Sequence, residues 1–371
     1  MLGSCVSNRT SNGVVVVFSD AWSAAHLVAG LPAAARALRE VAQAGVSRCT
    51  IAVPGGWRPD RNAAAELSRL AQDMVYSVVD TASLTGDDAP QLLLQGEHPV
   101  SAERLRSALS GAEPPHGALL FAPPRDWARL PQLTRAQAIA RLDRAAEAII
   151  AGTSKSGDGI VSQLINRPIS QAISRFLLRF PGITPFHATA VSALLAVAML
   201  ASLIFGGANG MILGAIFYQL ASIVDGVDGE IARATFRSSR AGAMADSLVD
   251  AVTNIGFLAG LDINLWIQGN AEAAIAGSLG LAIVALGLFL IGRRARRSKA
   301  AFTFDEVKTH FQARRSWLFQ TLIWLTMRDF FALGWLVGIV AGVAAPGLML
   351  FSFGAAVWLV VVVFVLRPRQ T

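Results

Sequence analysis

The sequence predicts two parts of different fold class, an α/β domain over residues 1–152 and an all-α transmembrane domain of six helices over residues 183–371. Two observations predict this division. Of the 371 residues, 53% are hydrophobic and only 15% are charged, a more apolar composition than soluble domains have. The apolar residues are also unevenly placed, because long apolar runs alternate with short charged segments only after about residue 180.

Strand and helix patterns alternate along the N-terminal part. Strands are expected at 13–18, 49–56, 74–80 and 91–96, and helices at 31–45, 61–74, 101–110 and 134–152. Such alternation predicts a parallel sheet with both faces covered. The apolar run at 14–18 is too short for a cleaved secretory signal, so we expect this domain to stay in the cytoplasm. Cys5 and Cys49 are too few for a disulfide framework or a metal site.

A linker and an amphipathic helix are expected over residues 153–182. The stretch GIVSQLINRPISQAISRFLLRF begins at Gly159 and carries Arg167, Arg175 and Arg179 at intervals among apolar residues. A basic amphipathic helix of this kind typically lies in the interface of a membrane. We therefore predict an interfacial helix immediately before the first transmembrane span.

Six apolar stretches follow, each long enough, or nearly so, to cross about 30 Å of hydrocarbon. They lie at about 184–205, 210–232, 243–267, 271–292, 329–345 and 347–366. The turns near 206–210, 268–270 and 345–347 contain no Lys or Arg, whereas the opposite ends of the stretches are rich in arginine. The positive-inside rule then predicts a multi-pass inner-membrane protein with both termini in the cytoplasm. The net charge of +7 is explained by these ends, so no nucleic-acid partner is expected.

Four aspartates interrupt the second and third apolar stretches. Asp225 and Asp228 lie near the cytoplasmic end of one, and Asp246 and Asp250 near the cytoplasmic start of the next. Spacings of three and four place each pair on one helix face. The short loop at 234–241 makes the two helices antiparallel neighbours, so we expect the four carboxylates to converge on one cavity.

The energetic cost of these carboxylates indicates what binds there. An Asp at the centre of a membrane costs about 2.5–3.5 kcal/mol on the insertion scale, and close like charges repel one another. Divalent cations remove both costs, and a site with oxygen ligands alone favours Mg²⁺ or Mn²⁺ over zinc. The structural alternative is that the aspartates cap helix ends or pair with Arg233, Arg237 and Arg240.

The spacing of these residues resembles the motif of the CDP-alcohol phosphotransferases, also called CDP-alcohol phosphatidyltransferases. The match consists of Asp225-x-x-Asp228-Gly229-x-x-Ala232-Arg233, eight further residues, and Gly242-x-x-x-Asp246-x-x-x-Asp250. The resemblance implies two divalent ions, either Mg²⁺ or Mn²⁺, bound to the pyrophosphate of a CDP-alcohol donor. It also implies a homodimer.

The resemblance further implies a role for each motif residue. Asp225, Asp228 and Asp246 hold the ions. Asp250 contributes to the metal site and also acts as the base on the acceptor hydroxyl. The small residues let the cytidine and its phosphates approach the helix backbone, and Arg233 neutralises phosphate or holds the aspartates. The metal ligands are then Asp225, Asp228, Asp246 and Asp250, and the donor-binding set is Asp225, Asp228, Gly229, Ala232, Arg233 and Gly242.

Segments outside the motif resemble one subgroup, in which a nucleotidyltransferase-like domain precedes the transferase. They are DGIVSQLINRPIS (158–170), ITPFHAT (183–189) and MRDFF (327–331). The subgroup includes enzymes that make di-myo-inositol phosphate phosphate from CDP-inositol. Many family members carry an Asn where this chain has Phe186, which removes any polar role at that position.

The N-terminal part is weakly similar to sugar-phosphate nucleotidyltransferases. Two features depart from that pattern: SDAWSAAHLVAG (19–30) replaces a Gly-rich phosphate loop, and Glu97 stands where Gly-Asp is expected. We therefore expect a degenerate domain without catalysis. The alternative is a bifunctional enzyme in which Glu97 binds a metal ion for cytidylyl transfer.

The predicted function is metal-dependent transfer of a phosphoalcohol or phosphatidyl group to an acceptor alcohol with release of CMP, as in the synthesis of phospholipid head groups. CDP-diacylglycerol and CDP-inositol are the two donors considered, the second in a reaction of the di-myo-inositol phosphate phosphate type. Membrane lipids are further partners. Acceptor or phosphate contacts are expected from Arg293, Arg294 and Arg328. A divalent-cation transporter is the alternative of another class, because acidic residues within spans also line ion paths.

Overall fold

A computed structural model describes residues 13–86, 89, 91–111, 119–154, 158–297 and 327–366. The chain divides into two compact units, and neither is a single continuous segment. The first comprises Met1–Thr153, Ser174–Ile183 and Arg233–Phe236, and the second comprises Ser154–Ile173, Thr184–Ala232 and Arg237–Thr371. Two short segments that come late in the sequence therefore fold with the N-terminal unit.

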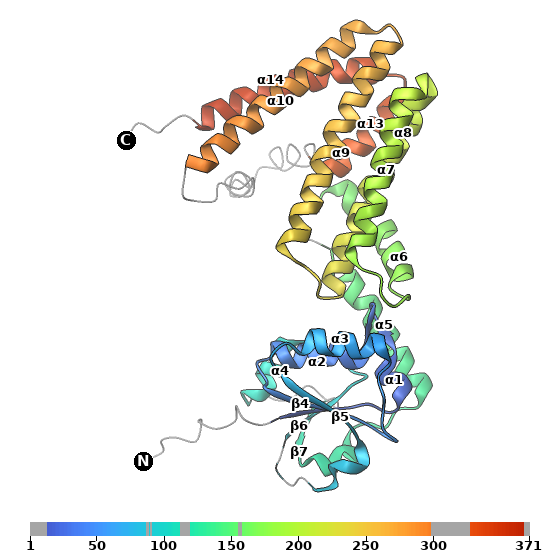
Figure 1. The fold of residues 1–371 in the computed structure, drawn as a ribbon, viewed down its shortest axis with the longest axis vertical. Coiled ribbons are helices and arrows are strands. Elements are labelled where there is room, and N and C mark those ends of the chain that lie inside the picture. Colours follow the sequence, from blue (N-terminus) through green and yellow to red (C-terminus); the bar gives the residue numbers. More distant parts are fainter. Residues whose placement is uncertain are drawn as a thin grey trace. The chain divides into compact units, whose positions relative to one another are not determined.

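The first unit contains a five-stranded sheet of order β5-β4-β1-β6-β7 (Figure 1). Its strands are β1 (Val14–Val17), β4 (Arg48–Val53), β5 (Val75–Asp80), β6 (Gln91–Gln95) and β7 (Leu119–Ala122). The central β1 runs parallel to both neighbours, with Val14 opposite Cys49 and Leu92. The predicted parallel sheet is thus confirmed, but β7 was not predicted and pairs antiparallel with β6. An antiparallel strand at the edge of a parallel sheet is common in α/β folds.

The two faces of the sheet are covered differently. Val14 and Val16 point to a core formed with α2 (Ala33–Gln43), α3 (Arg61–Ala71), α4 (Ala102–Leu109) and α5 (Arg135–Ala151). Val15 and Val17 point to a smaller core beside two 3₁₀ helices, η1 (Thr81–Gly86) and η2 (Pro124–Arg129). Successive side chains of a strand point to opposite faces, so one run of four valines contributes to both cores.

A compact connection follows β1, where nucleotidyltransferases have a Gly-rich phosphate loop. It consists of the short helix α1 (Ala21–Ala25) and a hairpin of β2 (Leu27–Val28) and β3 (Leu31–Pro32). The two hairpin strands are joined by Ala29 and Gly30, whose φ angles are 46° and 83°. Positive φ at both central residues is characteristic of the tight turns that join antiparallel strands. Because the hairpin occupies residues 27–32, α2 begins at Ala33 rather than at residue 31.

The second unit is helical. After a π-helical turn (Ser162–Asn166) and α6 (Arg167–Leu177), its helices are α7 (Pro185–Phe205), α8 (Gly207–Ala234), α9 (Arg240–Ile267), α10 (Ala271–Arg297), α13 (Arg328–Val340) and α14 (Ala344–Leu366). Among the described residues, three helices are long and apolar enough to cross a membrane, namely α7, α8 and α9. Shorter apolar stretches lie in α10 and α14, at Ala271–Gly287 and Ala344–Val360.

The expected fifth span differs most from the prediction. A span was expected over 329–345, but α13 ends at Val340 and has 13 residues, which extend only about 20 Å. Gly342 follows with a φ of 76°, a backbone conformation that does not continue a helix. The described residues therefore support a membrane protein with three candidate spans, and the count of six stays a prediction.

Polar and aromatic contacts fix the packing of α7, α8 and α9. The amide of Asn264 on α9 donates to the carbonyls of Leu203 on α7 and Gly207 on α8, at 2.5 and 2.9 Å. Tyr218 on α8 stacks on Phe257 of α9, with ring centroids 4.3 Å apart. These contacts set the rotation of α8 and α9, and so determine which residues the two helices present to each other.

Candidate functional site

Aspartates from two consecutive helices meet in the second unit. Asp225 on α8 and Asp246 and Asp250 on α9 each offer a carboxylate oxygen, and these oxygens lie within 4.8 Å of one another. The spacing of four residues in α9 places two of the carboxylates on one face of the helix. The connection between α8 and α9 is short, since α8 ends at Ala234 and α9 begins at Arg240, so the third carboxylate is brought alongside.

Asp228 lies outside this cluster, which contains three aspartates in the described part of the chain rather than the four expected. It is buried, with 6% of its surface exposed, and its Oδ2 accepts a 2.8 Å hydrogen bond from the hydroxyl of Thr189 on α7. A step of three residues leaves two side chains about 60° apart around a helix, which is enough for Asp225 to face the cluster while Asp228 faces Thr189 on α7. Whether Asp228 binds an ion therefore stays a prediction.

A polar cavity of about 170 Å³ opens beside the aspartate cluster. Its wall includes Asp225, Asp250, Arg167, Arg328 and Asp329. The wall therefore combines carboxylates with two guanidinium groups. A space with charges of both signs suits a ligand that carries phosphate and hydroxyl groups.

Arg328 is the predicted arginine that the structure places at the aspartates. Its Nη1 lies 3.0 Å from Oδ1 of Asp225 and also contacts Oδ1 of Asp250. Arg293 is exposed on α10 and is not part of the cavity wall, and the side chain of Arg294 lies outside the described residues. Arg328 thus lies at the aspartates, whereas its contact with acceptor or phosphate stays a prediction.

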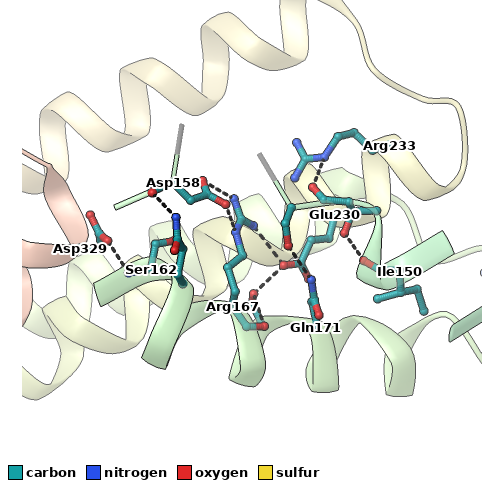
Figure 2. Close-up of polar contacts among 12 residues, drawn as sticks. Ile150, Asp158, Ser162, Arg167, Gln171, Glu230, Arg233 and Asp329 are labelled. Atoms are coloured by element: carbon teal, nitrogen blue, oxygen red, sulfur yellow. Dashed lines mark hydrogen bonds and ion pairs between the residues drawn. The ribbon is translucent and has the colours of Figure 1, made fainter. Parts of the chain in front are cut away.

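A second ionic network includes Asp158, Arg167 and Ser170, which also line the cavity (Figure 2). Arg167 binds Asp158 through two hydrogen bonds of 2.7 and 3.1 Å, and its Nη1 donates to Glu230 at 3.0 Å. The hydroxyl of Ser170 also donates to Glu230, at 2.6 Å. Glu230 lies on α8 two residues after Asp228 and is only 1% exposed. The network therefore fixes α8 against α6 close to the motif.

The roles of Glu230 and Asp158 were not predicted from the sequence. Glu230 stands at a position that the family motif leaves open, between Gly229 and Ala232, so the motif gave no reason to select it. The available signal was energetic, because a further carboxylate in an apolar helix requires a partner. Arg167, in the preceding amphipathic stretch, is that partner.

Asp329 completes the wall of the cavity at the start of α13. Its Oδ2 accepts a 2.6 Å hydrogen bond from the backbone N–H of Ser162 (Figure 2). This bond joins α13 to the π-helical turn before α6. The cavity is therefore bounded by side chains from segments far apart in the sequence.

The remaining motif residues have different surroundings. Gly229 and Ala232 are half-buried on α8, whereas Gly242 is exposed in the first turn of α9 and its N–H donates to Oγ of Ser239. Arg233 donates from Nε to the carbonyl of Thr153 at 2.9 Å, a contact within the first unit. Its expected action on phosphate or on the aspartates stays a prediction.

Glu97 lies at the end of β6 and faces the end of β1. It is 0% exposed, and its Oε1 accepts hydrogen bonds from the N–H of Ser19 at 2.5 Å and the hydroxyl of Ser23 at 2.8 Å. The ring of Phe18 fills the space beside Gly96, where an added Cβ would lie 2.4 Å from a ring carbon. The adjoining cavity is only about 10 Å³, the size of one water molecule. Side chains thus fill the strand ends at which open α/β sheets usually bind ligands.

The aspartate cluster fits a divalent cation. All its ligand atoms are carboxylate oxygens, which hard cations such as Mg²⁺ and Mn²⁺ prefer. The contact of Arg328 with two of the carboxylates shows that they are oriented toward a common position suited to positive charge. Asp225, Asp246 and Asp250 are the residues that can hold the ion.

An apolar helical unit with an acidic cluster on consecutive helices is typical of a membrane protein that binds a metal ion. Residues 183–364 match the family model of the CDP-alcohol phosphatidyltransferases. The resemblance inferred from the aspartate motif is thereby confirmed for this helical part of the chain.

Similar curated proteins carry the name bifunctional IPC transferase and DIPP synthase. The chain is 34% identical to that of Thermococcus kodakarensis over 154 residues, which cover 41% of this chain and 33% of the relative. It is 36% identical to that of Rubrobacter xylanophilus over 159 residues, or 43% of this chain and 34% of the relative. The protein of Archaeoglobus fulgidus is 39% identical over 118 residues, covering 31% and 23% of the two chains. Each match thus spans about a third of the relative or less.

Proposed function

We propose that the chain is an integral membrane CDP-alcohol phosphotransferase, which moves a phosphoalcohol or phosphatidyl group from a CDP-alcohol to an acceptor hydroxyl and releases CMP. The cluster of Asp225, Asp246 and Asp250 carries this proposal. The cluster lies within the part of the chain that matches the CDP-alcohol phosphatidyltransferase family. A cavity beside it provides space for the reacting groups.

The reaction forms a bond between the acceptor oxygen and the phosphorus of the donor and breaks the anhydride bond to CMP. Asp250 accepts the proton of the acceptor hydroxyl, a task for which a carboxylate at the cavity wall is suited. Asp225 and Asp246 would hold the divalent ions together with Asp250. The chemistry supplied by such ions would be neutralisation of the charge that develops on the attacking and leaving oxygens. Arg328 supplies further positive charge beside the phosphate.

The donor is held by the residues of the motif. Asp228 would help to hold an ion at the pyrophosphate of the CDP-alcohol, and Arg233 would neutralise phosphate or hold the aspartates. Gly229, Ala232 and Gly242 let the nucleotide approach the backbone of α8 and α9. The preferred ions are Mg²⁺ or Mn²⁺, and two are bound. These roles follow from the position of each residue in the family motif, and the half-buried state of Gly229 and Ala232 is compatible with them.

Two substrate classes are proposed, and they require different donors. In the first, CDP-diacylglycerol reacts with a polar alcohol such as inositol phosphate or glycerol phosphate to make a phospholipid head group. In the second, CDP-inositol reacts with inositol phosphate, and the DIPP synthase name of the relatives favours this class. The filled strand ends at Phe18 and Glu97 support an N-terminal domain that makes neither donor.

The proposed topology has six spans after an interfacial helix, with the active site and both termini on the cytoplasmic side. The three candidate spans α7, α8 and α9 support it, as does the arginine-rich character of one set of helix ends. A homodimer is the proposed assembly, as the family resemblance implies. Membrane lipids surround the spans.

The test uses the full chain purified in detergent. CDP-diacylglycerol and CDP-inositol are each supplied with inositol phosphate or glycerol phosphate, and CMP is measured with Mg²⁺, with Mn²⁺ and with a chelator. We expect CMP with one donor, only when a divalent ion is present. Absence of CMP with every pair, together with ion flux in vesicles, would establish the divalent-cation transporter instead.

The alternative of a bifunctional enzyme requires cytidylyl transfer by the N-terminal domain. It requires release of pyrophosphate from CTP and inositol phosphate, and this release should disappear in Glu97→Ala. We expect no pyrophosphate from the wild-type chain, because Oε1 of Glu97 is already bonded to Ser19 and Ser23.

A further inference from the structure

Residues Arg233–Phe236 comprise the last two residues of the motif helix α8 and the turn that follows it, and they fold with the first unit. They come directly after the donor motif on α8 and lead into α9, which carries Asp246 and Asp250. The last carbonyls of a helix have no partner within the helix and require donors from elsewhere. The residues that donate to these carbonyls therefore help to fix the connection between α8 and α9, the two helices that carry the aspartates.

Two arginines of the N-terminal unit donate to this segment. Arg36 on α2 donates to the carbonyl of Ala234 at 2.6 Å, and Arg69 on α3 donates to the carbonyls of Thr235 and Phe236 at 2.9 and 3.3 Å. A positive charge is favourable at a helix C-terminus, where the carbonyl dipoles point outward. The end of α8 is thus capped by residues more than 160 positions earlier in the chain.

The capping arginines are themselves held in place. Arg36 is 4% exposed and donates to the carbonyls of Val28 and Ala29 as well. Burial lowers the pKa of Arg36 to about 10, which leaves it protonated at neutral pH. Arg69 binds Oε2 of Glu66, one turn earlier on α3, through hydrogen bonds of 2.6 and 2.9 Å.

Phe236 anchors the segment from the other side. Its φ is 53°, a left-handed conformation that is costly for a residue with a side chain. The guanidinium carbons of Arg36 and Arg39 lie 5.3 and 5.6 Å from the centre of its ring, within the range of cation–π attraction. Thr235, next to it, is buried. Hydrogen bonds, cation–π contacts and burial therefore all act on residues 233–236. Of these four residues, only Arg233 belongs to the family motif.

We propose that the N-terminal unit acts as a brace for the transferase site, in which Arg36 and Arg69 cap the end of α8, hold the turn into α9 and so position the aspartates for donor binding. This gives the domain a task that does not require nucleotide chemistry. The catalytic consequence rests on the proposed function, whereas the brace itself is independent of it. Arg36 and Arg69 are positioning residues, since they act through the 233–236 segment.

The test compares Arg69→Met with Arg106→Met in the full chain. Arg106 is the matched control, because it is an exposed arginine that donates to the carbonyl of Gln43 at the end of α2, at 3.3 Å, and not to the 233–236 segment. Hydrogen exchange of peptides covering residues 233–241 should become about tenfold faster in Arg69→Met and stay unchanged in Arg106→Met. Arg69→Lys should recover part of the protection, and Phe236→Leu should behave as Arg69→Met does.

A kinetic measurement separates positioning from loss of folded protein. With the donor that releases CMP, Arg69→Met should raise the donor KM about tenfold and leave the acceptor KM unchanged. A purely structural effect would lower kcat with the amount of folded enzyme and change neither KM. Equal exchange in Arg69→Met and Arg106→Met would overturn the brace, and faster exchange with a normal donor KM would overturn its positioning role. If the wild type releases no CMP, the proposed function fails while the exchange result still decides the brace.

Discussion

The hydroxyl of Thr189 donates a 2.8 Å hydrogen bond to Oδ2 of Asp228, and so joins α7 to the motif helix α8. Asp228 is almost completely buried, and a buried carboxylate is stable only when its oxygens are bonded. The bond therefore holds the one motif aspartate that lies outside the cluster of three. It also gives Thr189, in the segment ITPFHAT, a defined structural partner.

Thr189→Val should reduce CMP release. The substitution keeps the shape of the side chain and removes a hydrogen bond to a charged group, which contributes about 1.5–3 kcal/mol, so a loss of about 10- to 100-fold is expected. Thr253→Val is the matched control, because the Thr253 hydroxyl donates to the carbonyl of Val249 in its own helix. Equal activity of the two variants would show that the Thr189–Asp228 bond is not used in the reaction.

Each of Asp225→Asn, Asp246→Asn and Asp250→Asn should lower CMP release at least about a hundredfold, because each removes an ionic ligand or the base. Mn²⁺ should raise the melting temperature of the wild type and not that of these variants, since an ion stabilises only the folded state that binds it. The control is Asp262→Asn, a buried aspartate on the same helix that lies 12 residues beyond Asp250 and accepts from Ser278. A normal Mn²⁺ shift in the cluster variants would contradict the metal site.

Arg167→Gln should destabilise the second unit by about 3–5 kcal/mol, because it removes the guanidinium that donates to the buried Glu230 at 3.0 Å. The double variant Arg167→Gln with Glu230→Gln should recover part of this loss, which gives a measurable coupling energy. Thermal unfolding of the four chains in detergent provides the comparison. Additive losses in the double variant would show that Arg167 and Glu230 do not depend on each other.

Asp20 makes the stability of the N-terminal unit depend on pH. Desolvation alone would raise the pKa of Asp20, but hydrogen bonds from Ser23 and Arg135 outweigh it and hold the pKa below the ordinary 3.8. Because the folded pKa is the lower one, the stabilisation is present above about pH 4 and is lost as the pH falls through the folded pKa. Asp20→Asn keeps a capping oxygen but cannot ionise.

The corresponding measurement is hydrogen exchange of α1 at several pH values, corrected for the intrinsic pH dependence of exchange. At pH 6, α1 should be less protected in Asp20→Asn than in the wild type, and the difference should disappear below the folded pKa. A difference of the same size at every pH, from pH 6 down to the lowest pH at which the unit stays folded, would show that the charge of Asp20 is not its cause.

Sequence periodicity was sufficient for much of the fold. The four valines of β1 predicted a buried strand, and α7, α8 and α9 lie where apolar stretches were expected. The antiparallel strand β7 and the β2–β3 hairpin were missed, because short segments carry too little periodic signal. The shorter α13 was also missed, since hydropathy does not register the backbone break near Gly342.

The acidic site was predicted only in part. The spacing of Asp246 and Asp250 and the short α8–α9 connection were enough to predict that carboxylates from two helices meet. The different direction of the Asp228 side chain could not be predicted, because it depends on how α8 is rotated against α7. Arg328 was named as a candidate, but its contact with Asp225 could not be inferred, since the two residues are about a hundred positions apart.

What the sequence determined by itself is local: the apolar periods, the helix faces and the motif spacing that resembles the CDP-alcohol phosphatidyltransferases. What only the tertiary structure decided is the set of partners: Thr189 for Asp228, Arg167 for Glu230, and Arg36 and Arg69 for the end of α8. The physical reason is the range of the interactions. Helix and strand periods repeat over a few residues, whereas a buried charge or an unpaired carbonyl takes whichever donor the folded chain brings to it.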